Sequence, residues 1–125
     1  MLIIGKPSVL IVDDDIAILH VFSKIFQRKG YSVQVAEKSA EAIEKLKLAK
    51  YDVALIDFGL PDMNGLDLFP LINNESPKTL KIMLTGKTWL LGSIEGADAF
   101  LGKPVNPDRL LSIIETKLKN RDVET

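Results

Sequence analysis

Residues 9–15 read Val-Leu-Ile-Val-Asp-Asp-Asp, a short apolar run that ends abruptly in three consecutive carboxylates. The run is mostly β-branched and does not alternate with polar residues, which is typical of a strand covered on both faces. We expect this strand to end at Asp13. Beyond it, Ile16 and Leu19 begin a series of apolar residues at helical spacing, and Lys29-Gly30 supplies a stop. The stretch therefore predicts a strand followed at once by a helix.

The same alternation of strand and helix patterns continues along the chain. Further strands are expected at residues 31–35, 53–56, 80–84 and 99–101. The helices between and after them are marked by an N-cap at Ser39, a short helix over 66–72 interrupted by Pro70, and Pro107 in the first turn of a last helix. Five strands alternating with helices predict an α/β fold, with a doubly wound parallel sheet covered on both faces.

Length and composition favour one ordinary globular domain. The chain has 125 residues, 46% of them apolar and 26% charged, and a net charge of -1. We expect an N-terminal extension over 1–7, one domain over 8–119 and a frayed helical tail over 120–125. No basic field points to direct nucleic-acid binding, and no apolar stretch is long enough for a membrane span. The absence of cysteine suits a cytoplasmic location.

Polar residues stand at the ends of four of the predicted strands. They are Asp13 with Asp14 and Asp15, Asp57, Thr85 and Lys103. The carboxyl ends of parallel strands share one edge of the sheet, so Asp13, Asp14 and Asp57 should converge there. Carboxylates that lie close together repel one another unless a cation joins them. Hard oxygen ligands of this kind suit Mg²⁺, and we therefore expect a divalent ion.

This set of residues fits phosphoryl transfer to a carboxylate. Such a transfer forms an acyl phosphate and needs positive charge and hydrogen-bond donors around the phosphoryl oxygens. Lys103 supplies the charge and Thr85 a hydroxyl, while Gly59 and Gly86 allow backbone N–H groups to approach. Each residue alone has a local explanation as a helix cap or a turn residue. Together they predict a phosphorylation switch at Asp57.

The chain resembles the receiver domains of two-component response regulators. The resemblance runs from Ser8 to about Leu118 and rests on residues 9–15, 52–57, 60–65, 84–85 and 96–104. It implies a flavodoxin-like (βα)5 fold with a five-stranded sheet in the order 2-1-3-4-5. It also implies that the protein is a signalling switch and not an enzyme, although it catalyses its own phosphorylation and dephosphorylation.

The resemblance implies a role for each residue of the site. Asp57 would be the phosphoacceptor, and Mg²⁺, with Mn²⁺ as a substitute, would be held by Asp13, Asp14, Asp57 and the backbone carbonyl of Gly59. Of the acidic pair, Asp14 would be the more direct ligand.

Three further residues would transmit the signal. The resemblance implies that Lys103 contacts the phosphoryl group, that the Thr85 hydroxyl moves toward it, and that Phe100 changes rotamer with Thr85. The Lys103-Pro104 bond would be cis. A sensor histidine kinase or a phosphotransfer protein would supply the phosphoryl group, and the domain would act on a downstream partner as a monomer or weak dimer.

One departure from the family pattern and three other functions remain open. Between Thr85 and Lys103 the chain is about four residues shorter than most receivers, or about one helical turn, which predicts a shortened fourth helix within 88–95. The protein could be a phosphorylation-independent scaffold. Asp13-x-Asp15 also suits a phosphatase of the haloacid-dehalogenase type, and the layered fold suits a flavodoxin-type module, although three aspartates would repel a flavin phosphate.

Overall fold

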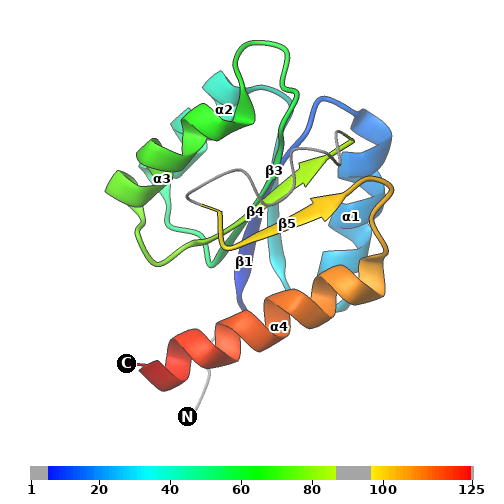
Figure 1. The fold of residues 1–125 in the computed structure, drawn as a ribbon, viewed down its shortest axis with the longest axis vertical. Coiled ribbons are helices and arrows are strands. Elements are labelled where there is room, and N and C mark those ends of the chain that lie inside the picture. The colour runs from blue at the N-terminus through cyan, green and yellow to red at the C-terminus, as the bar shows by residue number, and fades with distance from the viewer. Residues whose placement is uncertain (1–5, 87–96, 125) are drawn as a thin grey trace.

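The structure is a computed structural model that describes residues 6–86 and 97–124. Five parallel strands form one sheet in the order β2-β1-β3-β4-β5, which is the flavodoxin-like order expected from the sequence. Figure 1 shows α2 and α3 on one side of the sheet, with α1 and α4 on the other. The strands are β1 (Ser8–Val12), β2 (Ser32–Ala36), β3 (Val53–Asp57), β4 (Leu80–Thr85) and β5 (Ala99–Gly102). The helices are α1 (Ile16–Arg28), α2 (Ser39–Leu48), the 3-10 turn η1 (Gly65–Asp67), α3 (Leu68–Glu75) and α4 (Pro107–Glu124).

Helices α1 and α4 begin where the sequence predicts. Helix α3 differs from the expectation in its bounds. Pro70 does not interrupt a helix, because it lies in the first turn of α3, where a backbone N–H has no acceptor within the helix. A 3-10 turn occupies the preceding residues, so the expected helix over 66–72 begins later and runs further. The last helix runs to Glu124, so the tail expected over 120–125 is helical as far as the structure describes it. The shortened helix predicted within 88–95 lies outside the described residues.

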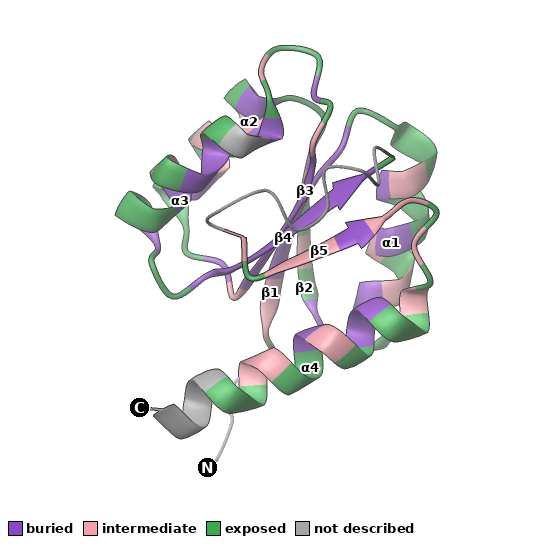
Figure 2. Ribbon diagram, in the orientation of Figure 1, coloured by how far each residue is buried: buried purple, intermediate pink, exposed green. Residues whose placement is uncertain are grey.

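Strands β3 and β4 are buried along their whole length (Figure 2). Residues that alternate along each strand face opposite layers, as the pleat of a strand requires. Val9 and Ile11 belong to the core shared with α1 and α4, whereas Leu10 and Val12 belong to the core shared with α2 and α3. Because both faces are packed, the register of the strands is fixed, and so is the position of each carboxyl end.

The N-terminal ends of α1 and α2 are capped in different ways. Asp15 Oδ1 accepts the N–H groups of Ala17 at 2.9 Å and Ile18 at 3.4 Å, so the last of the three aspartates is the N-cap of α1. Ser39 was expected to cap α2, but it is the first residue of that helix. The capping carboxylate instead comes from Asp62, which lies in the loop after β3.

Asp62 caps α2 with both of its carboxylate oxygens. Oδ1 accepts the N–H of Ser39 at 2.9 Å, and Oδ2 accepts the N–H of Ala40 at 3.0 Å. Lys38 holds the N-cap position and makes no side-chain hydrogen bond to the helix. A negative charge at a helix N-terminus is favourable because it faces the free N–H groups and the positive end of the helix dipole.

The outer edge of the sheet at β2 is occupied in part by a side chain. The Ala36 carbonyl points inward and accepts the N–H of Asp13 at 3.0 Å, so the preceding carbonyl, that of Val35, points away from the sheet. The ammonium group of Lys45 on α2 donates a hydrogen bond to this Val35 carbonyl. The same Nζ lies 3.7 Å from Glu41 Oε2. One backbone acceptor of the edge strand is therefore already in use.

We expect removal of the Asp62 carboxylate to destabilise the fold in a pH-dependent way. The backbone hydrogen bonds from Ser39 and Ala40 hold the pKa of Asp62 below its ordinary value. A carboxyl whose pKa is lowered by folding stabilises the protein above the unfolded-state pKa of about 3.9, and this stabilisation is lost as the pH falls through the folded-state pKa. Asp62→Ala should therefore lower the Tm at neutral pH, with a difference from the wild type that shrinks in acid.

Thermal unfolding followed by circular dichroism would measure both differences. The matched control is Lys38→Ala, which removes a side chain from the same helix end without breaking a cap hydrogen bond. A difference between Asp62→Ala and the wild type that stays constant down to the most acid pH tolerated by the fold would contradict the expectation.

Candidate functional site

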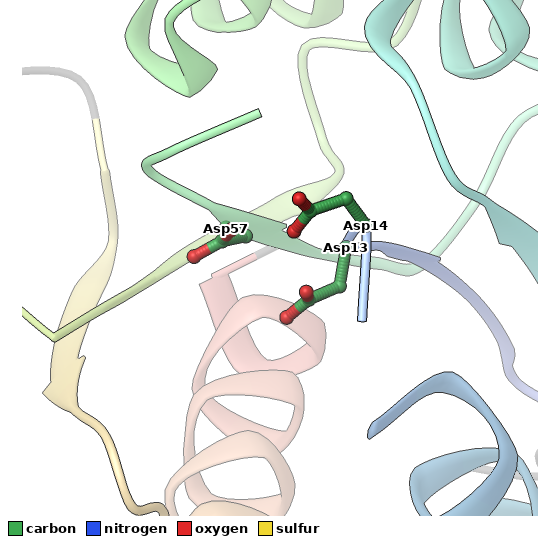
Figure 3. Close-up of side chains that lie close together, drawn as sticks. All are labelled: Asp13, Asp14 and Asp57. Atoms are coloured by element: carbon green, nitrogen blue, oxygen red, sulfur yellow. The ribbon is translucent and has the colours of Figure 1, made fainter. Parts of the chain in front are cut away.

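Three carboxylates meet at the carboxyl edge of the sheet. Asp13 and Asp14 follow β1 directly, and Asp57 is the last residue of the neighbouring strand β3. One oxygen from each of the three lies within 4.8 Å of the others. Figure 3 shows the three side chains gathered at these two strand ends. Asp13 and Asp57 are buried and Asp14 is exposed, so the cluster opens to solvent on the side of Asp14.

Lys103 joins two of these carboxylates. Its Nζ lies 2.8 Å from Asp13 Oδ2 and 3.1 Å from Asp57 Oδ1. The backbone holds this lysine in place, because its N–H donates to the Thr85 carbonyl at 2.8 Å at the end of β4. The Lys103-Pro104 peptide bond is cis, as the resemblance implied. The ammonium therefore lies between the ends of two strands that are not neighbours of β5.

The electrostatics of the cluster leave a surplus of negative charge. Burial lowers the pKa of Lys103, but its hydrogen bonds to Asp13 and Asp57 and the attraction of both charges outweigh this, so the pKa is raised and the side chain stays protonated. The pKa of Asp13 is raised, first by burial and further by the charge of Asp57. Hydrogen bonds from Lys103 and the Asp15 N–H oppose that rise without cancelling it.

A divalent cation fits this donor set. Three carboxylates with closely spaced oxygens face one lysine, and burial makes the uncompensated charge costly. Carboxylate oxygens are the ligands that Mg²⁺ prefers, and the exposed position of Asp14 leaves room for water ligands. Among the described residues, this is the one group of three or more acidic or histidine side chains close enough to hold a metal ion.

Thr85 and Phe100 lie on the next two strands and on the same face of the sheet. Thr85 ends β4 and is buried, and its neighbour Leu84 pairs with Asp57 across the β3–β4 ladder. Phe100 on β5 pairs with Met83, which is two residues before Thr85. Residues two apart on a strand face the same way, so Thr85 and the half-buried Phe100 both belong to the face of α2 and α3.

Gly59 and Gly86, which were expected to let backbone N–H groups approach the phosphoryl oxygens, lie beside open space. A third glycine, Gly65, is sterically required. A Cβ at Gly59 or Gly86 would meet no atom within 4 Å, so the protein itself does not demand glycine at either position. At Gly65 a Cβ would lie 2.3 Å from the backbone oxygen of Asp57. No separate role for Gly65 was expected from the sequence. The available signal was its place at the end of the turn-rich segment 60–65.

Comparison with known proteins identifies the family. The family model described as the response regulator receiver domain matches residues 9–115. The chain belongs to this family. A response regulator receiver domain protein from Methanospirillum hungatei, described as CheY-like, has a solved structure that is 37% identical. It superposes with a TM-score of 0.88, and the match covers 97% of this chain and 100% of that one.

Curated relatives of this receiver domain are longer proteins. The acid tolerance regulatory protein ActR of Rhizobium meliloti is 35% identical over 111 residues, which are 86% of this chain and 57% of ActR. The DNA-binding response regulator MtrA of Mycobacterium tuberculosis is 29% identical over 123 residues, which are 95% of this chain and 54% of MtrA. The chain thus spans about half the length of the curated relatives it matches.

Family membership narrows the functions left open by the sequence. Response regulators are signalling proteins and not metabolic enzymes, so the haloacid-dehalogenase and flavodoxin alternatives are set aside. Receiver domains interact with histidine kinases or phosphotransfer proteins and generally bind Mg²⁺ at an acidic pocket. In this chain Asp13, Asp14 and Asp57 form an acidic cluster that could hold a metal ion. None of the described helices has the length and apolar character that crossing a bilayer requires.

We expect Gly65→Ala to destabilise the receiver domain by about 1–3 kcal/mol, the usual cost of overpacking. The obstructing atom belongs to the backbone of Asp57, so no side-chain rotation relieves the clash. Urea unfolding of the variant and the wild type would measure the loss. Gly59→Ala is the matched control, because its added methyl group enters open space and its stability should not fall. Equal losses in the two variants would refute this steric explanation.

Proposed function

We propose that this receiver domain is a phosphorylation switch in which Asp57 accepts a phosphoryl group from a sensor histidine kinase or a phosphotransfer protein. The observation that carries the proposal is the setting of the Asp57 carboxylate. Its Oδ1 contacts the Lys103 ammonium at 3.1 Å, and it shares a cluster with Asp13 and Asp14. A nucleophile, a cation and two further carboxylates therefore lie together at the carboxyl edge of the sheet.

Transfer begins with attack of an Asp57 carboxylate oxygen on the phosphorus of a phosphohistidine. The phosphorus–nitrogen bond breaks, the imidazole leaves with the electron pair and takes up a proton, and an acyl phosphate remains on Asp57. Lys103 contacts a phosphoryl oxygen and offsets the charge that gathers there. Later attack by water on phosphorus releases inorganic phosphate and restores the Asp57 carboxylate. The protein is thus a signalling switch that takes part in its own modification.

We assign the metal to Asp13, Asp14, Asp57 and the backbone carbonyl of Gly59. Bound there, Mg²⁺ or Mn²⁺ would supply positive charge to the oxygens of the transferring phosphoryl group. Asp14 is exposed and is the most accessible ligand, whereas Asp13 is buried and also bound to Lys103. The open space beside Gly59 and Gly86 is compatible with backbone N–H groups contacting the phosphoryl oxygens.

The switch that we propose runs through Thr85 and Phe100. Phosphorylation adds a charge of about -1.5 to -2 beside the carboxylate cluster, and the Thr85 hydroxyl moves toward it as a hydrogen-bond donor. Thr85 and Phe100 face the same layer of the domain, so this movement frees space into which the Phe100 ring turns. The change on this face alters the binding of a downstream partner.

The setting that we propose is the cytoplasm, where the domain acts as a monomer or weak dimer. MtrA is named as DNA-binding, but a net charge of -1 gives this domain no basic field, and we assign it no direct contact with nucleic acid. A phosphorylation-independent scaffold is the remaining alternative, and the next experiment separates the two functions.

We expect acetyl phosphate to add the mass of one phosphoryl group to the wild-type chain in the presence of Mg²⁺. Asp57→Ala should show no adduct, because the nucleophile is gone, and chelation of the metal should abolish the adduct on the wild type. Intact-mass spectrometry measures all three. Asp52→Ala is unsuitable as a control because Asp52 accepts the Ser8 N–H, so Asp67→Ala, an exposed carboxylate, serves instead. An unmodified wild-type chain would favour the scaffold.

We expect Thr85→Ala to separate phosphorylation from its structural response. The adduct should still form at Asp57, since neither the nucleophile nor Lys103 is changed. The Phe100 ring should no longer respond, because the hydroxyl that moves is absent. Side-chain resonances of Phe100, recorded by NMR with and without a beryllofluoride complex, report this response in the wild type and the variant. A Phe100 shift of equal size in both would rule out the threonine as the link.

A further inference from the structure

The loop that follows β3 is closed at its base by contacts of its own backbone. We call residues 58–65 the β3–α3 loop. The Phe58 carbonyl accepts the N–H of Gly65 at 3.0 Å, and Gly59 pairs with Asn64 in an isolated antiparallel bridge. The two ends of the loop are therefore fixed to each other. The tip between them depends on contacts with other parts of the domain.

One side chain joins the tip of the β3–α3 loop to the N-terminus of α2. The two oxygens of the Asp62 carboxylate accept the N–H groups of Ser39 and Ala40, at 2.9 and 3.0 Å. Both donors belong to the backbone of the first helical turn, so this double contact sets the direction of the carboxylate as well as its distance. The same hydrogen bonds lower the pKa of Asp62, which is therefore charged at neutral pH.

The connection between β2 and α2 is also bonded to the segment that follows β1. The Ala36 carbonyl at the end of β2 accepts the Asp13 N–H at 3.0 Å. Two residues further along, at Ser39, α2 begins. The Glu37 N–H between them donates to Glu41 Oε1 at 2.9 Å, so this short connection is itself held at the helix. The connection and the start of α2 thus form a brace between the β1 segment and the β3–α3 loop.

The two braced segments supply all of the ligands that we assign to the metal. Asp13 and Asp14 follow β1, whereas Asp57 ends β3 and Gly59 lies in the β3–α3 loop. A carboxylate adjusts to an ion by rotating its side chain, but the Gly59 carbonyl moves only with the loop backbone. A Cβ at Gly59 would meet no atom within 4 Å, so close packing does not confine the backbone on that side. Mg²⁺ accepts little variation around about 2.1 Å.

We propose that Asp62 is a positioning residue for the metal site, which holds the Gly59 carbonyl at the distance from Asp13 and Asp14 that Mg²⁺ requires. The inference rests on the proposed function, because the metal ligands are those assigned above. Asp62 acts through the loop backbone, since both of its oxygens are engaged at α2. Partners outside the ligand set commonly orient metal ligands in this way. By linkage, metal binding strengthens the Asp62 cap as much as the cap strengthens metal binding.

The first test is a calorimetric titration of the intact, unphosphorylated chain with Mg²⁺. Asp62→Ala should weaken Mg²⁺ binding about fivefold or more, a typical size for coupling between two sites. Asp67→Ala is the matched control, because it removes the same charge from the start of α3, where the side chain makes no cap hydrogen bond. This control should bind Mg²⁺ as tightly as the wild type.

A double variant separates positioning from helix capping. Lys38 holds the N-cap position of α2, so Lys38→Ser added to Asp62→Ala gives the helix a new cap that does not reach the loop. Most of the Tm lost in Asp62→Ala should return, whereas Mg²⁺ binding should stay weak. Lys38→Ala added to Asp62→Ala removes the same lysine charge without a new cap and should restore neither. Recovery of both properties with Lys38→Ser would overturn the proposal, because Asp62 would then be a structural cap alone.

Amide hydrogen exchange of the wild type tests the linkage without relying on a variant. Saturating Mg²⁺ should slow exchange at Ser39 and Ala40, the two donors of the cap, because opening the cap then also disturbs the metal site. Unchanged exchange at both amides would overturn the proposal. A wild-type chain that binds no Mg²⁺ would contradict the metal assignment itself, whereas equal binding by the wild type and Asp62→Ala would contradict only the role of Asp62.

Discussion

The contacts of one ammonium group hold the carboxyl edge of this receiver domain together. Lys103 follows β5 at one side of the sheet, yet its Nζ reaches Asp57 on β3 and Asp13 beyond β1. The two carboxylates are buried and repel each other, and burial already raises the pKa of Asp13. Without Lys103 this pair of like charges would have no fixed counterion among the residues that the structure describes. The ends of three strands are therefore linked by a single side chain.

The alternation of side chains along the strands explains why these charges meet. Asp13, Asp57 and Lys103 each continue the series of residues that faces α1 and α4 on its own strand. Thr85 continues the other series, which faces α2 and α3 and includes Phe100. The carboxylate chemistry and the proposed switch thus belong to opposite faces of the same sheet. A shift of one residue in any one of these strands would turn that strand's site residue to the opposite face of the sheet.

Local patterns in the sequence were enough to locate the strand ends, the start of α1 at Ile16 and the family. These local patterns could not show which of the three aspartates caps α1, because an aspartate side chain suits both a helix cap and a metal ligand. In the structure Asp15 is the cap. Two further features depend on contacts distant in sequence. Asp62 caps a helix more than 20 residues away, and Gly65 is required by the backbone of Asp57. The buried position of Lys81 also had no local signal.

The lysine at the outer edge of β2 has a consequence for how the molecule behaves among its own copies. An edge strand offers free N–H and C=O groups on which a strand from another chain can assemble. At Val35 the outward carbonyl is already bound by Lys45, a residue that also brings a positive charge to the edge. A second sheet approaching here would have to displace that ammonium first. Growth into an intermolecular sheet, the first step toward aggregation, is opposed on this side by one side chain from α2.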